Sequence, residues 1–227
     1  MSSFSRRIER LLMNVTSRPW LQRRHGRLVL ERVAGCDLLI LPDVMNPRIF
    51  RSGACFARAV QGGLIEPESH VLDMGAGSGI VSIIAALAGA NVVAVDINPA
   101  AVRCTRINAM LINVEDRVDA RQGDLFEAVQ GQCFDRILFN PPYFRGAPQP
   151  GFEQSWRSVD VVERFAADLG RHLTPGGSAF LALSTHGDVA GFQHVFNKNG
   201  YEQTIVSSHR QLAETFLVFR FRPRCAE

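Results

Sequence analysis

The sequence predicts an α/β protein with a doubly wound, mostly parallel sheet of seven strands, preceded by a short N-terminal helix and a β-hairpin. Three observations lead to this. From residue 70 onward, short β-rich runs alternate with helical segments, as in βαβ units. A glycine-rich turn follows the first of these runs. Acidic or amide residues stand at the ends of the next runs, and ligands of such sheets bind beyond the carboxyl ends of the strands.

The N-terminal part is predicted to be an extension of residues 1–66, followed by the main domain of residues 67–227. Apolar residues at helical spacing predict an amphipathic helix over residues 4–15. Two β-rich runs, 28–33 and 36–41, flank an Ala-Gly pair and predict a hairpin.

A second helix is predicted over residues 51–61, with Ser52 as its N-cap and Gly62 and Gly63 as its stop. In the main domain the predicted strands are 70–74, 91–96, 118–122, 134–140, 178–184, 201–208 and 215–222. The predicted helices are 80–88, 99–112, 158–173 and 188–199, with residues 174–177 as a stop between helix and strand. Because no helix separates the last two strands, one of them is expected to be antiparallel.

Composition narrows the class of protein. The chain is 46% hydrophobic, enough for one sizeable core, and no apolar run approaches the ~20 residues that span a bilayer. The five cysteines are odd in number and lack the spacing of metal ligands, so we predict reduced thiols and no metal site. A cytoplasmic protein without a membrane segment is expected.

Charge is uneven along the chain. Residues 1–32 carry eight arginines against two glutamates, whereas the whole chain has a net charge of only +3. A basic arm of this kind suggests an anionic partner such as RNA. A solvated face in an arginine-favouring protein and a transit segment remain alternatives.

The glycine-rich turn runs from Asp73 to Gly79. Its glycines permit a tight turn and let a ligand approach the backbone, and the following helix offers free N–H groups to an anion. The spacing is Gly-x-Gly-x-Gly, which is not the dinucleotide pattern, and no P-loop lysine follows. The candidate cofactor-binding residues here are Asp73, Gly75, Ala76, Gly77 and Gly79.

Two further acidic residues follow the next strands. Asp96, with Ile97 beside it, ends the second strand and can accept the hydroxyls of a ribose, unless it caps the next helix in place of Asn98. Asp124 follows the third strand and can receive an adenine amino group while Leu125 packs on the ring; the alternative is a turn aspartate.

The fourth strand ends abruptly at Asn140-Pro141-Pro142-Tyr143. The prolines cannot donate backbone hydrogen bonds, so this turn presents acceptors: the Asn140 amide oxygen and the Pro141 carbonyl. Tyr143 adds an aromatic face. Such a set suits a planar amino group, and an ordinary strand-ending turn is the alternative. Together with the acidic residues, it matches S-adenosylmethionine beside an amino-group acceptor.

These motifs resemble the class I S-adenosylmethionine-dependent N-methyltransferases, which have a Rossmann-like fold, and most closely the HemK-like protein-glutamine N5-methyltransferases that modify release factors. The matching segments are VLDMGAGSGIVS, AVDINPAAVRCTRINA, GDLF and FDRILFNPPY. Weaker likeness covers Asn46-Pro47-Arg48 with the helix after it, Trp156, DVVERFAADLGRHLTPGG and ETFLVFRF. The resemblance implies Asn140, Pro141 and Tyr143 as catalytic residues. It implies Asn140, Pro142, Tyr143 and Trp156 as the acceptor-binding residues, and it also places Asn140 among the cofactor-binding residues.

The resemblance also implies a transferase that methylates an amino or amide nitrogen of a macromolecule, either a protein glutamine or an RNA base. The short N-terminal part is more like relatives that work with a small activator protein. Two alternatives stay open: a biosynthetic N-methyltransferase acting on a small molecule, and a non-catalytic nucleic-acid-binding protein with a vestigial methyltransferase fold.

Overall fold

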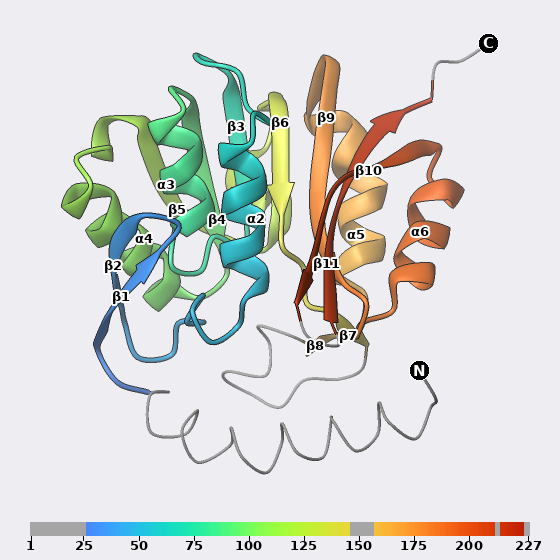
Figure 1. Cartoon of the computed structure of the whole chain (residues 1–227). Coiled ribbons are helices and arrows are strands. Elements are labelled where there is room, and N and C mark those ends of the chain that lie inside the picture. The colour runs from blue at the N-terminus through green and yellow to red at the C-terminus, as the bar shows by residue number, and fades with distance from the viewer. Residues whose placement is uncertain (1–25, 146–156, 212–213, 225–227) are drawn as a thin grey trace, which may run out of the picture.

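The computed structural model describes residues 26–145, 157–211 and 214–224. Its centre is a seven-stranded sheet in the order β10-β11-β9-β6-β3-β4-β5 (Figure 1). The strands are β3 (His70–Met74), β4 (Asn91–Asp96), β5 (Val118–Gln122), β6 (Phe134–Phe139), β9 (Leu173–Ser184), β10 (Tyr201–Gln211) and β11 (Glu214–Pro223). β11 runs antiparallel to both neighbours, and the other ladders are parallel. The predicted sheet is therefore confirmed, including one antiparallel strand at the end of the chain.

Helices cover both faces of the sheet. They are α2 (Ser52–Gln61), α3 (Ile80–Leu87), α4 (Pro99–Leu111), α5 (Val161–Asp168) and α6 (Val189–Lys198), with short 3-10 turns η1 (Glu115–Arg117), η2 (Leu125–Val129) and η4 (Leu169–His172). Successive strand residues point to opposite faces, so Val71 packs in the core of α2, α3 and α4, whereas Leu72 packs in the core of α5 and α6. This is the doubly wound arrangement that the sequence predicts.

The predicted hairpin is present as β1 (Val29–Val33) and β2 (Cys36–Ile40), which pair antiparallel. Its two turn residues both have positive φ, 50° at Ala34 and 88° at Gly35, as a two-residue hairpin turn requires. The inner side chains of β2 are buried in the core of α2, α3 and α4, which joins the hairpin to the main sheet. The division at residue 66 stays a prediction, and the helix predicted over 4–15 lies outside the described residues.

Three expectations about element ends are wrong. Ser52 does not cap α2: Arg51 holds the N-cap position, and the Ser52 hydroxyl instead accepts a hydrogen bond from the Asn140 side chain. The helix predicted over 158–173 begins at Val161, because residues 157–158 form the short strand β8 beside β7 (Phe144–Arg145), and it ends at Asp168, where the 3-10 turn η4 follows. In this turn the Ser158 hydroxyl accepts the Val161 N–H.

The third correction concerns β9, which begins at Leu173 and not at residue 178. Residues 174–177 are part of the strand, at an irregularity in its pairing with β6. Gly176 takes a φ of 80° there, and a Cβ on Gly177 would meet the Phe134 carbonyl oxygen at 3.0 Å. The two glycines thus let a strand kink where the sequence indicates a stop. In the part of the chain that the structure describes, no helix has the length and apolar character needed to cross a membrane.

A buried amide connects the hairpin to the main domain. Asn108 of α4 is fully buried; its Oδ1 accepts the Leu39 N–H at 2.7 Å, and its Nδ2 donates to the Leu39 carbonyl at 2.9 Å. The same Nδ2 donates to the Ser78 carbonyl, also at 2.9 Å. One side chain thus satisfies backbone groups of β2 and of the glycine-rich turn.

Replacing Asn108 with alanine is expected to lower the free energy of unfolding by about 2–4 kcal/mol, because it leaves these buried backbone groups unpaired. Urea unfolding followed by circular dichroism measures the change. The exposed Asn199, whose Nδ2 bonds only the Val195 carbonyl among described partners, is the matched control. Its alanine variant should change stability by less than about 0.5 kcal/mol. Equal losses in both variants would contradict the role given to Asn108.

Candidate active site

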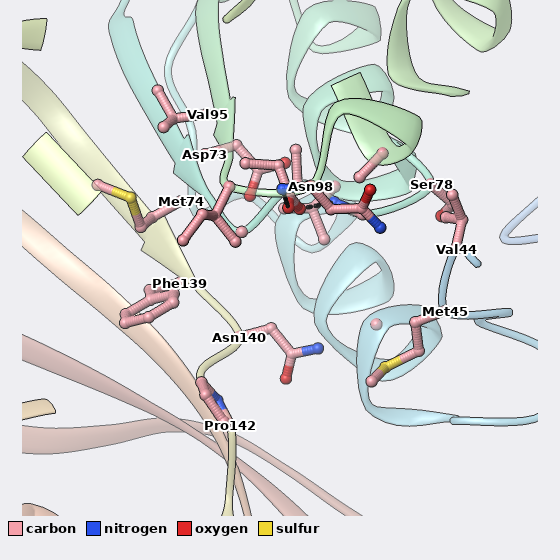
Figure 2. A pocket seen from close by; sticks show the side chains of 18 of the residues that line it. Val44, Met45, Asp73, Met74, Ser78, Val95, Asn98, Phe139, Asn140 and Pro142 are labelled. Carbon is pink, nitrogen blue, oxygen red and sulfur yellow. Dashed lines mark hydrogen bonds between the residues drawn. The ribbon is translucent and has the colours of Figure 1, made fainter. Parts of the chain in front are cut away.

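A cavity of about 500 Å³ lies at the carboxyl ends of β3, β4, β5 and β6 (Figure 2). Its volume is within the range of small-molecule sites. Among the predicted site residues, those that line it are Asp73, Gly75, Ala76, Gly77, Asp96, Ile97, Asp124, Leu125, Asn140 and Pro142. The predicted donor residues and part of the predicted acceptor turn therefore share one cavity.

The glycine-rich turn forms one wall of the cavity. Gly75 and Ala76 both donate backbone N–H groups to the Val95 carbonyl, which fixes the turn to β4. Gly75 and Gly77 have φ of 68° and 57°, and a Cβ on Gly77 would meet only the Gly75 carbonyl oxygen, at 3.9 Å. The backbone is thus open to a ligand at Gly77. Gly79 is different: it does not line the cavity, and a Cβ there would come within 3.0 Å of Thr105 on α4.

Asp96, at the end of β4, is held by the backbone on both of its oxygens. Oδ2 accepts the Gly77 N–H at 2.8 Å, and Oδ1 accepts the Asn98 N–H at 2.9 Å. Asp96 does not cap α4, because the Asn98 side chain accepts the Ala100 N–H and does so instead. Burial raises the pKa of Asp96, while these two bonds act in the opposite direction. A carboxylate can accept about four hydrogen bonds, so Asp96 keeps capacity for two ligand hydroxyls.

Asp73 lies deeper, at the end of β3, with 3% of its surface exposed. The Ser82 hydroxyl donates to its Oδ2 at 2.5 Å. Burial raises the pKa of Asp73 to about 7; the hydrogen bonds from Ser82 partly offset this effect, and the nearby Asp96 adds to it. Asp73 therefore keeps its proton up to near-neutral pH.

This raised pKa makes stability depend on pH. Unfolded Asp73 loses its proton near pH 4, whereas folded Asp73 keeps it to about 7. Between these values the folded state binds more protons, so stability falls as pH rises, by up to about 4 kcal/mol. We expect the Asp73→Asn variant to lack this pH-dependent loss of stability. Urea unfolding of both proteins from pH 4.5 to 8.5 measures it, and a pH-independent difference between them would contradict this assignment.

Asp124 follows β5 and is paired with an arginine that sequence reasoning missed. Arg164 of α5 donates to Asp124 Oδ2 at 2.6 Å, and this hydrogen bond raises the pKa of Arg164. Leu125, beside it, is buried and has a φ of 50°. Together with Ile97, which is 57% exposed, Leu125 gives this end of the cavity an apolar surface suited to a planar ring.

The turn after β6 places Asn140 at the other end of the cavity (Figure 2). Its Nδ2 donates to the Ser52 hydroxyl at 3.2 Å, and its Oδ1 accepts the Tyr143 hydroxyl at 2.6 Å. Pro142 lines the cavity, whereas Pro141 is buried beside it and does not. Tyr143 also does not line it, and burial raises its pKa. Trp156 lies outside the described residues.

Sequence reasoning missed one whole wall of the cavity. It is formed by the segment before α2 and by the start of that helix, and it consists of Asp43, Val44, Met45, Pro47, Phe50 and Gly53. The only signal for it was the weak likeness around Asn46. Phe139 and Val161 also line the cavity and were not predicted.

The residues fit S-adenosylmethionine. The turn offers an open backbone at Gly77 for the amino-acid end, Asp96 has spare acceptor capacity for the ribose, and Leu125 lies beside Asp124 for the adenine. The apolar side chains before α2 and at its start make the lining of the cavity mainly hydrophobic, as in other small-molecule sites.

Comparison with known proteins gives a family model and several relatives that this chain matches. Residues 58–205 match the family model of the methyltransferase small domain. The release factor glutamine methyltransferase of Cereibacter sphaeroides is 29% identical over 174 residues, which covers 70% of this chain and 60% of that protein. The chain spans between 45% and 66% of the length of the first curated relatives it matches.

Solved structures share the fold at low identity. The T. thermophilus 16S rRNA N2 G1207 methyltransferase, solved with AdoMet and guanosine, superposes with a TM-score of 0.66 and 22% identity, covering 87% of this chain and 50% of that one. The Mtq2–Trm112 complex of E. cuniculi is described as responsible for methylation of the eRF1 termination factor. It superposes with a TM-score of 0.60 and 19% identity, covering 80% of this chain and 99% of that one.

Proposed function

The chain belongs to the methyltransferase small domain family, and on that premise we propose that it transfers a methyl group from S-adenosylmethionine to an amino or amide nitrogen of a macromolecule. One observation carries the proposal. The donor-type residues at the ends of β3, β4 and β5 and the Asn140 amide at the end of β6 line the same cavity. A donor and an acceptor nitrogen bound there would meet without any rearrangement of the sheet.

The donor residues have distinct tasks. Gly77 and its neighbours would hold the amino-acid end, Asp96 the ribose and Leu125 the adenine ring. When bound, S-adenosylmethionine supplies an electrophilic methyl group, and its thioether leaves without needing an acid. The protein's remaining task is therefore to prepare the nucleophile.

Asn140 is the residue that does this. An amide or aromatic amino nitrogen has a delocalised lone pair, and it must become pyramidal before it attacks. A hydrogen bond from an N–H group of the acceptor to the Asn140 amide oxygen favours that geometry and draws positive charge from the nitrogen. The Pro141 carbonyl stays a predicted second partner, because Pro141 is not among the residues that line the cavity. Holding the nitrogen in line with the methyl group contributes up to ~7–11 kcal/mol. No general base is required during the transfer, because the nitrogen becomes acidic only as it is alkylated, and the surplus proton then passes to water.

Two acceptor classes fit this chemistry: a protein glutamine and the amino group of an RNA base. A Cereibacter relative named for release factor glutamine supports the first, and a solved enzyme named for an rRNA guanine supports the second. We favour the protein glutamine, because the curated relatives include several glutamine methyltransferases. A small activator protein is a further proposed partner, supported by the fold shared with the Mtq2–Trm112 complex.

Mass spectrometry tests the proposal. Release factors, ribosomal proteins and ribosomal RNA are purified from cells with and without the gene and compared. A methyl group missing from a single glutamine in the deletion strain, and restored by the wild-type gene but not by an Asn140→Ala gene, is the expected result. A methyl group missing instead from an RNA base would show that the acceptor is an RNA amino group and not a protein glutamine. Identical macromolecules in both strains would contradict a macromolecular substrate and favour a small-molecule acceptor.

A further inference from the structure

Ser52 lies at the first turn of α2, outside every motif that the sequence analysis assigned to the reaction. Its hydroxyl accepts the Asn140 Nδ2 at 3.2 Å, and only 6% of the residue is exposed. We propose that Ser52 is a positioning residue for the methyl transfer, which sets the orientation of the Asn140 amide from a helix of the N-terminal extension. This inference rests on the proposed function.

The contacts of Asn140 are the first support. Its amide has one side held by Ser52 and the other by the Tyr143 hydroxyl, which donates to Oδ1 at 2.6 Å. Two fixed contacts leave an amide of this kind with one further N–H and one further oxygen lone pair. The orientation of the plane, and so the direction in which its oxygen meets an acceptor, is set by both hydroxyls.

Ser52 also acts on Tyr143. Burial is the main effect that raises the pKa of Tyr143, and a hydrogen bond from Ser52 works against it. In the hydrogen-bond geometry Asn140 is the centre of the group, because its amide contacts both Ser52 and Tyr143. Removing the Ser52 hydroxyl takes the acceptor from the Asn140 Nδ2, so only the Tyr143 hydroxyl still holds the amide.

The position of Ser52 in the chain is the second support. Its neighbour Gly53 lines the cavity, as do Phe50 and Pro47, so the start of α2 borders the cavity beside the Asn140 turn. A Cβ on Gly53 would meet Pro47 and Ile80 at 3.6 and 3.8 Å, which shows how closely this turn packs on α3. Because α2 also buries Phe56, Ala57 and Val60 in the core, the helix that carries Ser52 is anchored to the main domain.

The test compares wild type, Ser52→Ala, Ser52→Thr and the double variant Ser52→Ala with Asn140→Ala. A recombinant release factor is the methyl acceptor. We expect Ser52→Ala to lower kcat by about tenfold, the effect of one lost hydrogen bond, with the Kd for S-adenosylmethionine unchanged within about twofold. Ser52→Thr, which keeps the hydroxyl, should recover most of the rate. In the Asn140→Ala background, Ser52→Ala should have no further effect.

A second readout does not depend on any substrate. The side-chain amide signals of Asn140, assigned in a ¹⁵N-labelled protein by their loss in Asn140→Ala, should shift and exchange faster with solvent in Ser52→Ala. Ser69→Ala is the matched control, because Ser69 is also buried and donates to the Glu66 carbonyl at 2.7 Å, away from the cavity lining. It should change neither the Asn140 signals nor kcat.

The two readouts separate the possible failures. Unchanged Asn140 signals in Ser52→Ala, or an equal loss of rate when Asn140 is already alanine, would overturn the positioning role. If wild type methylates no release factor while the Asn140 signals do respond to Ser52→Ala, the assigned acceptor is wrong and the hydrogen-bonded group stands.

Discussion

Replacing Asn140 with alanine is expected to lower the rate of methyl transfer by about 10²–10³ and to leave the affinity for S-adenosylmethionine unchanged, by analogy with the loss of one preorganised hydrogen-bond partner. The reason is the position of the residue. Asn140 lines the acceptor end of the cavity, and its oxygen interacts with Tyr143 and not with any donor-type residue. Single-turnover rates and calorimetry on the same preparations measure the two quantities.

Two control variants make this result specific. Asn140→Asp keeps an acceptor oxygen but cannot donate to Ser52. Its rate of methyl transfer should therefore lie between those of wild type and Asn140→Ala. The exposed Asn199→Ala should match wild type in both measurements. If Asn140→Ala instead weakened donor binding and left the single-turnover rate intact, Asn140 would belong to the donor site and the assigned role would be wrong.

Replacing Asp96 with alanine should mainly weaken the binding of S-adenosylmethionine, in contrast to Asn140→Ala, which should mainly lower the rate of methyl transfer. It removes the acceptor of the Gly77 and Asn98 N–H groups and the proposed partner of the ribose hydroxyls. Because hydrogen bonds to a charged group contribute about 1.5–3 kcal/mol each, we expect the Kd for S-adenosylmethionine to rise by about 10²-fold or more. Calorimetry at constant ionic strength measures it.

Asp119 provides the matched control for this prediction. It is an exposed aspartate on β5, paired with Arg121 at 2.6 Å and absent from the cavity lining. Asp119→Ala should bind S-adenosylmethionine with the wild-type Kd. The Kd of Asp96→Asn should lie between those of wild type and Asp96→Ala. If the folded Asp96→Ala variant bound S-adenosylmethionine with a Kd within twofold of wild type, the assignment of the ribose to Asp96 would be wrong.

The sequence was informative where function depends on backbone geometry. β4 and β5 have the predicted bounds; Asp96 is the last residue of β4 as expected, and Asn140 directly follows β6. A run of apolar strand residues that stops at a polar residue indicates both the strand and its end. The Asn98 cap could also be predicted, since asparagine before proline is a strong helix-start signal.

The sequence was least informative where distant segments meet. Ser52 has the features of an N-cap in one dimension, and only the packing of α2 near the β6 turn shows that its hydroxyl contacts Asn140, 88 residues away. Arg164 reaches Asp124 across 40 residues in the same way. No local pattern encodes such contacts, because they depend on how α2 and α5 lie over opposite faces of the sheet.

A crystal structure with S-adenosylhomocysteine, the product that the donor leaves behind, tests the central claim most directly. The account predicts adenine beside Leu125, both ribose hydroxyls on Asp96, and the sulfur facing the Asn140 side chain across the cavity. A ligand whose sulfur points away from the β6 turn, or lies where the Asn140 amide has no access to it, would contradict the claim that donor and acceptor meet there.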